Sequence, residues 1–87
     1  MTKNKTDWNI LGFVIASEYR KSILLALKDK PRTPKELTKI TGFHFSHVSS
    51  NLKNLQKVDL VECLNPRATK GRLFKLSKKG EILIKSI

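Results

Sequence analysis

Cysteine is nearly absent from this chain of 87 residues. Its single cysteine, Cys63, cannot form an intramolecular disulfide, which excludes the small secreted domains that disulfides hold together. Long hydrophobic runs are also missing, because the apolar stretch over residues 10–16 is interrupted by Gly12 and is too short to span a membrane. No cleavage site of the signal-peptide kind follows it. We therefore expect a cytoplasmic protein with no membrane partner.

Acidic residues are scarce. Lysine and arginine outnumber aspartate and glutamate by 18 to 7, which gives a formal net charge of +11. Such an excess favours nucleic acid as a partner, because binding releases the counterions that a polyanion holds. The alternative is a soluble basic domain, since basic charge alone specifies neither a fold nor a site. The length indicates one domain, which leaves little room for an enzyme that houses a cofactor.

Motifs for catalysis are missing as well. The sequence has no phosphate-binding glycine loop, no paired carboxylates beside a base and no nucleophile motif, so we expect no enzyme and no cofactor. His44 and His47 could be combined with Cys63 or Glu62 as a metal site. A lone cysteine without a second pair of ligands is more typical of a small buried hydrophobe, so we expect no metal. Local hydrogen bonding is the expected role of His44.

The first part of the chain predicts a helical arm over about residues 8–28. Asp7 can cap a helix that begins at Trp8, and Ser17 offers a second N-cap, so we expect a bend near Ser17. Pro31 should end the arm, because the residue before a proline is disfavoured in the helical conformation. The expected buried positions are Ile10, Leu11, Val14, Ile15, Tyr19, Ile23, Leu24 and Leu27.

The clearest helix start in the sequence is Thr33-Pro34-Lys35-Glu36, which supplies an N-cap, a proline at the first helical position and a glutamate that can reach back to the cap. This helix should carry Leu37 and Ile40 inward and end at Thr41-Gly42, where glycine can adopt the left-handed conformation.

A second helix should follow from Phe43 and end near residue 58, so that the pair covers about residues 34–58. Val48, Leu52 and Leu55 are spaced as its buried stripe, Phe43 should fill the turn, and Leu60 should pack beneath the helix.

The hydrophobic period then changes from helical to alternating, which predicts a β-hairpin over about residues 61–76. Asn65-Pro66 begins its turn, and its tip is basic. Ser77 can cap a last helix over about residues 78–87. The fold class is thus mainly α with a small β-hairpin (α+β).

This order of elements resembles the winged helix-turn-helix transcriptional regulators of the ArsR and MarR type. The resemblance is carried by TPKELTKITGF (residues 33–43), HVSSNLKNL (47–55), the preceding SEYRKSIL (17–24) and the hairpin strand GRLFKLSKKG (71–80). The run over residues 61–66 is most similar to small archaeal members. The resemblance implies one winged helix-turn-helix domain over residues 1–87 that binds double-stranded DNA and regulates transcription.

In such a protein the second helix of the motif, here about residues 45–57, lies in the major groove. With Val48, Leu52 and Leu55 turned to the core, the other face is free to meet base edges, or is simply solvated. Serine, histidine and phenylalanine there can contact bases, but none reads a base through two hydrogen bonds, so the expected sequence preference is modest. The candidate base-contacting residues are Phe45, Ser46, His47, Ser49, Ser50 and Lys53.

The hairpin, or wing, carries Arg67, Lys70 and Arg72, which we expect on phosphate or in the minor groove; the alternative is a solvated tip. Further candidates for phosphate contacts are Thr33, Lys35, Lys39, Lys53 and Lys57.

Regulators of this kind generally dimerise to meet two half-sites, and apolar residues near both ends of the chain could pair two copies or complete one core. No effector site can be identified in the sequence. The alternatives to a DNA-binding regulator are a winged-helix module that docks RNA or a protein complex, and a nonspecific DNA-architectural protein.

Overall fold

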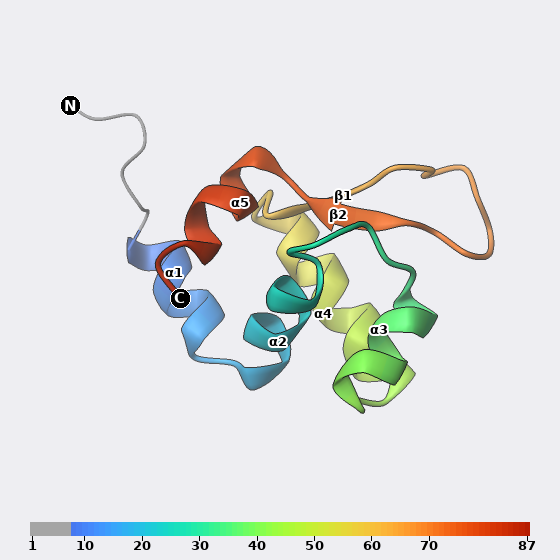
Figure 1. The fold of residues 1–87 in the computed structure, drawn as a ribbon, viewed down its shortest axis with the longest axis horizontal. Helices are drawn as coiled ribbons and strands as arrows, with labels where there is room; N and C mark the ends of the chain where they lie inside the picture. Colours follow the sequence, from blue (N-terminus) through green and yellow to red (C-terminus); the bar gives the residue numbers. More distant parts are fainter. Residues whose placement is uncertain (1–7) are drawn as a thin grey trace.

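The computed structural model describes residues 8–87, and it has the predicted order of elements (Figure 1). The elements are α1 (Trp8–Ile15), α2 (Glu18–Ala26), α3 (Pro34–Thr41), α4 (Phe45–Lys57), β1 (Val61–Cys63), β2 (Phe74–Leu76) and α5 (Lys78–Ile84). No helix in this part of the chain is long and apolar enough to cross a membrane. The predicted cap at Asp7 lies outside the described residues.

The helical arm is bent where the sequence predicted. The Ser17 hydroxyl accepts a hydrogen bond of 3.3 Å from the Arg20 N–H and so starts α2. Burial of Ile15 was predicted wrongly, because this residue ends α1 beside the bend and is 51% exposed. The arm ends at Ala26, near the predicted end at about residue 28. The Arg32 Nε donates to the Ala26 carbonyl at 2.9 Å and satisfies a carbonyl at this helix end.

The predicted start and stop of α3 are confirmed. Thr33 and Glu36 form a reciprocal capping box, and Gly42 closes the helix at a φ of 78°. The inward position of Ile40 was predicted wrongly, since its side chain is 51% exposed. Thr41 is half-buried instead, and its hydroxyl donates to the Leu37 carbonyl and accepts from the Phe43 N–H that opens the turn.

The core forms around α4, whose predicted stripe of Val48, Leu52 and Leu55 is buried. This helix packs against α2, α3 and β1. Leu60 is fully buried after the helix ends, and Phe43 packs against the core from the turn, as predicted. The face of α4 opposite this stripe is therefore left to solvent.

The wing is an antiparallel pair in which Val61 faces Leu76 and Cys63 faces Phe74. Arg32 forms an additional bridge to Phe74, a pairing between distant segments that the sequence did not reveal. In Figure 1 the loop of the wing extends away from α1 and α5. The last helix, α5, ends at Ile84 and is shorter than the predicted range.

Candidate nucleic-acid interface

The outward face of α4 is polar at its start and basic toward its end. Successive residues of a helix are separated by about 100°, so Ser46, Ser50, Lys53 and Lys57 fall on the side opposite the buried stripe. All four residues are exposed. This ridge can meet the floor of a groove in a macromolecule without disturbing the core.

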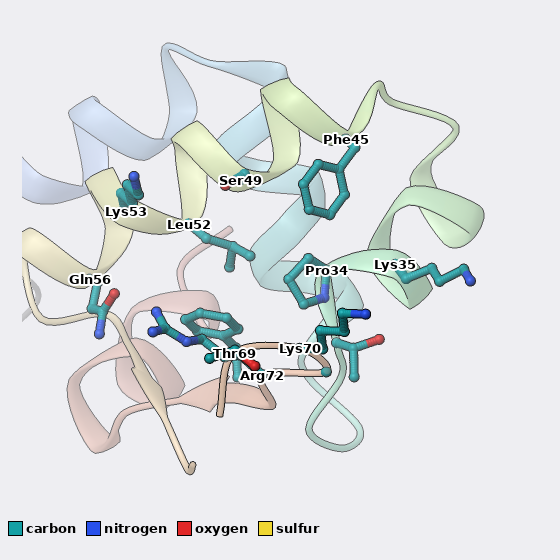
Figure 2. A pocket seen from close by; sticks show the side chains of 13 residues that line it. Pro34, Lys35, Phe45, Ser49, Leu52, Lys53, Gln56, Thr69, Lys70 and Arg72 are labelled. Carbon is teal, nitrogen blue, oxygen red and sulfur yellow. The ribbon is translucent and has the colours of Figure 1, made fainter. Parts of the chain in front are cut away.

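One side of α4 borders an open groove shared with α3 and the wing, which we call the wing-side groove (Figure 2). Its volume is about 520 Å³. It is lined by Thr33, Pro34, Lys35, Phe45, Ser49, Leu52, Lys53, Gln56, Thr69, Lys70, Gly71, Arg72 and Phe74. The lining contains four basic side chains and no acidic one, so the groove is complementary to an anion.

Seven of the predicted contact residues line this groove: Thr33, Lys35, Phe45, Ser49, Lys53, Lys70 and Arg72. Phe45 is 57% exposed, and Figure 2 shows its ring directed toward Pro34, with Lys35 and Lys53 on opposite sides of the groove. Thr69 and Gln56 also line it and were missed. Gln56 lies seven residues after Ser49 on the same helical face, so helical spacing could have identified it.

The remaining predicted residues lie elsewhere. Arg67 is exposed on the wing outside the wing-side groove. Arg72, which does line the groove, also forms a hydrogen bond within the wing, because its Nε donates to the Ala68 carbonyl at 2.8 Å. Ser46, His47 and Ser50 line a second hollow on the other side of α4.

This second hollow, which we call the α2-side hollow, has a volume of about 290 Å³. It is lined by Tyr19, Ser46, His47, Ser50 and Asn51. The His47 ring is stacked on Tyr19 with centroids 4.7 Å apart, so α2 fixes its position. His44 is the N-cap of α4, but its side chain makes no capping hydrogen bond; local hydrogen bonding as its role was predicted wrongly. Its imidazole instead lies near that of His47, with ring centroids 6.1 Å apart.

No metal-binding cluster is present between residues 8 and 87: no group of three His, Cys, Asp or Glu side chains is close enough to hold an ion. Cys63 is half-buried, and its thiol lies 3.6 Å from the Asn65 Oδ1.

Charge at the start of α3 is set by the capping box. A hydrogen bond from the Thr33 backbone N–H lowers the pKa of Glu36 below its usual 4.5, and the charges of Lys30 and Arg32 act in the same direction. Glu36 is therefore a carboxylate at neutral pH, where it serves the cap. Within the described chain, the side-chain ammonium groups of Lys35, Lys53 and Lys70 take part in no hydrogen bond or ion pair, so their charges are available to an outside anion.

Helix, turn, helix and basic wing together define the winged helix-turn-helix class of DNA-binding transcriptional regulators. Residues 17–62, more than half of the chain, match the model of the bacterial regulatory protein family ArsR. The chain belongs to this family and is a DNA-binding transcriptional regulator. No curated protein sequence matches it significantly.

Solved structures share the fold. HlyU from Vibrio cholerae is 25% identical with a TM-score of 0.77, over 99% of this chain and 92% of HlyU. The homodimeric winged helix-turn-helix DNA-binding domain of Mb0332 from Mycobacterium bovis is 19% identical with a TM-score of 0.70, over 98% of this chain and 84% of that one. A MarR mutant from E. coli, solved with operator DNA, is 23% identical with a TM-score of 0.72, over 90% of this chain and 60% of MarR.

Some of these proteins are longer. The chain spans 60% of MarR and 49% of a mutant ZitR from Lactococcus lactis, to which it is 23% identical with a TM-score of 0.72 over 80% of its own length.

Proposed function

We propose that this regulator binds duplex DNA with α4 in the major groove and the wing on the flanking backbone. The observation that supports this most directly is the wing-side groove, whose lining holds Lys35, Lys53, Lys70 and Arg72 without an acidic residue. A second support is the exposed polar ridge of α4, which lies opposite the buried stripe. Phosphate contacts from the groove would position the helix, and the ridge would contact base edges.

The proposed contacts are those expected from the sequence: Thr33, Lys35, Phe45, Ser46, His47, Ser49, Ser50, Lys53, Arg67, Lys70 and Arg72. The exposed face of α4 has no arginine, asparagine or glutamine placed among its first residues to form two hydrogen bonds with one base. We therefore propose a modest sequence preference that depends on the shape of the DNA and on apolar contact between Phe45 and a thymine methyl group.

We propose that the protein acts as a homodimer. Trp8 and Ile15 are 68% and 51% exposed on α1, and Ile87 is 38% exposed beyond α5. In Figure 1, α1 and α5 lie at the end of the molecule away from the wing, so pairing there leaves α4 free. Mb0332, which has this fold, is homodimeric.

Four further points stay our predictions. We expect one domain that spans the chain, no catalytic activity and an archaeal source. We also expect a cytoplasmic location, because that is where a regulator that binds the chromosome works.

Fluorescence anisotropy with labelled duplex DNA, single-stranded DNA and duplex RNA, at rising salt, tests the proposal. K53E places a negative charge on the DNA-facing ridge and should weaken duplex binding at least tenfold, on the order of one lost phosphate contact plus repulsion. K28E is the matched control, because Lys28 is exposed in the loop after α2 and outside both hollows that flank α4.

Equal weakening by K53E and K28E would contradict a DNA contact through α4. Duplex binding that is equal on all sequences and disappears at physiological salt would indicate an architectural protein. A preference for RNA, or no nucleic-acid binding, would favour the docking alternative.

A further inference from the structure

We propose that the α2-side hollow is a second contact site for the DNA backbone, in which the Tyr19 hydroxyl donates a hydrogen bond to a phosphate. This site would hold the strand that lies across the major groove from the wing. The inference rests on the proposed function and adds to it a residue outside the helix-turn-helix motif, on a helix that had no assigned DNA contact.

Two aromatic contacts fix the Tyr19 ring. It packs edge-on against Phe43 of the turn with centroids 4.7 Å apart, and it is stacked with His47 of α4, also at 4.7 Å. Phe43 is in turn positioned by the hydrogen bond between its N–H and the Thr41 hydroxyl at 3.2 Å. The tyrosine is thus held by the turn and by α4, and its hydroxyl needs little ordering when a ligand binds.

The hollow presents several hydrogen-bonding groups to one space. Over residues 8–87, no protein group hydrogen-bonds the hydroxyls of Tyr19, Ser46 and Ser50 or the ring nitrogens of His47. Asn51 differs, because its Nδ2 donates to the His47 carbonyl at 2.8 Å. Hydroxyl donors are common partners of DNA phosphates, and no carboxylate lines the hollow to repel one.

The position of the hollow identifies which strand it would meet. A helix in the major groove lies between two phosphate backbones, about 12 Å apart across the groove. Here α4 is bordered by the wing-side groove on one side and by the α2-side hollow on the other. The lysines of the wing-side groove account for one strand. Tyr19 and His47, which are not part of the ridge that would contact base edges, are the groups placed to meet the second strand.

The chemistry of the two sides differs, which makes the proposal testable. The wing-side groove is lined by cations, whereas the α2-side hollow is lined by hydroxyls, an amide and an imidazole. Contacts from cations release counterions and steepen the dependence of affinity on salt, but a contact from a neutral hydroxyl does not. Loss of the Tyr19 contact should therefore lower affinity by the same factor at every salt concentration.

The experiment is anisotropy with duplex DNA for the full chain carrying Y19F, which removes the hydroxyl and keeps the ring and its two contacts. Affinity should fall about tenfold or more, as for one hydrogen bond to a charged partner, with an unchanged salt slope and an unchanged melting temperature. S22A, which removes an α2 hydroxyl that lies 3.4 Å from a Glu18 carboxylate oxygen and lines neither hollow, is the control and should bind as wild type does.

The contact is then located with a duplex whose sequence has been selected for tight binding to the protein. In this duplex, single phosphates are replaced one at a time by neutral methylphosphonates. Wild type should lose affinity at a phosphate on the strand across from the wing, and Y19F should be insensitive there. If K53E weakens binding but Y19F does not, the Tyr19 contact is overturned while DNA binding through α4 stands. If K53E has no effect either, the proposed function fails and the hollow loses its role with it.

Discussion

Gly80 shows how one residue can fix the position of a whole helix. A Cβ placed on Gly80 would collide with the carbonyl oxygen of Leu60, which also accepts a hydrogen bond of 2.9 Å from the Ser77 N–H. The Ser77 hydroxyl donates to the Asp59 carbonyl at 2.6 Å and accepts from the Gly80 N–H. The absence of a side chain thus lets α5 pack directly on the segment that leaves α4.

We predict that G80A destabilises the protein by about 1–3 kcal/mol, because backbone must move to admit the methyl group. G12A is the matched control. Gly12 lies in α1 with nothing within 4 Å of an added Cβ, so alanine should raise stability by about 0.5–1 kcal/mol. Thermal or urea unfolding followed by circular dichroism measures both changes, and equal effects of the two substitutions would contradict the collision.

Glu36 predicts a pH dependence of stability. Its pKa is lowered in the folded state by the Thr33 backbone hydrogen bond. A lowered pKa means that the carboxylate stabilises the fold above its unfolded pKa of 4.5 and that this contribution is lost as pH falls through the lower folded pKa.

E36Q keeps a side-chain acceptor but cannot titrate. The difference in melting temperature between wild type and E36Q should therefore shrink as pH is lowered from about 6 to about 3. E62Q, on β1 and outside any cap, provides the comparison for a general loss of negative charge. A constant difference between wild type and E36Q across this range would show that the cap does not depend on ionisation.

At the scale of an element, the wing is held by the Asn65 side chain as well as by its strands. The Asn65 Oδ1 accepts from the Leu73 N–H at 2.6 Å, and its Nδ2 lies 3.3 Å from the Gly71 carbonyl. β1 and β2 are three residues each, too short to order a long loop alone. Asn65 therefore joins the two sides of the hairpin beyond the strands.

We predict that N65A loosens the wing and weakens duplex binding about fivefold, the effect of one lost hydrogen bond on the order of 1 kcal/mol. The core should unfold at nearly the wild-type temperature, because Asn65 is exposed. Amide hydrogen exchange should accelerate at Leu73. The Phe74 amide, bonded to the Arg32 carbonyl at 2.9 Å, is the internal control, and equal acceleration at both amides would indicate general unfolding instead.

At the scale of the whole molecule, charge and apolar surface are separated. The basic wing-side groove lies between α3, α4 and the wing, whereas the exposed side chains of Trp8 and Ile15 lie on α1. In Figure 1, α1 lies at the opposite end of the molecule from α3 and the loop of the wing. This separation allows one end to bind DNA while the other pairs two copies.

We predict that I15E reduces dimerisation without unfolding the monomer, because Ile15 is half-exposed and outside the core cluster. L64E is the matched control, since Leu64 has a similar exposure of 47% but lies in the wing, directly after β1. Sedimentation velocity should show a monomer for I15E and a dimer for wild type and L64E. A dimer for all three would place the interface elsewhere.

Local rules predicted much of this molecule correctly. The capping box at Thr33, the stop at Gly42 and the buried stripe of α4 depend on residues a few positions apart, so the sequence alone determined them. Ile15 and Ile40 were placed inward by the same spacing, but each lies at an end of a short helix where the neighbouring elements leave it exposed.

The sequence predicted candidate contact residues, but not how the structure divides them between two hollows. The sequence by itself determined the fold class, the basic wing and the polar face of α4, because these follow from periodicity, capping and composition. Only the tertiary structure decided that Ser49 and Lys53 line one hollow while Ser46 and His47 line another with Tyr19. The tertiary structure likewise decided that Arg32 forms a bridge to Phe74. Such contacts join segments far apart in the chain, and their formation depends on how the packed helices place these segments in space.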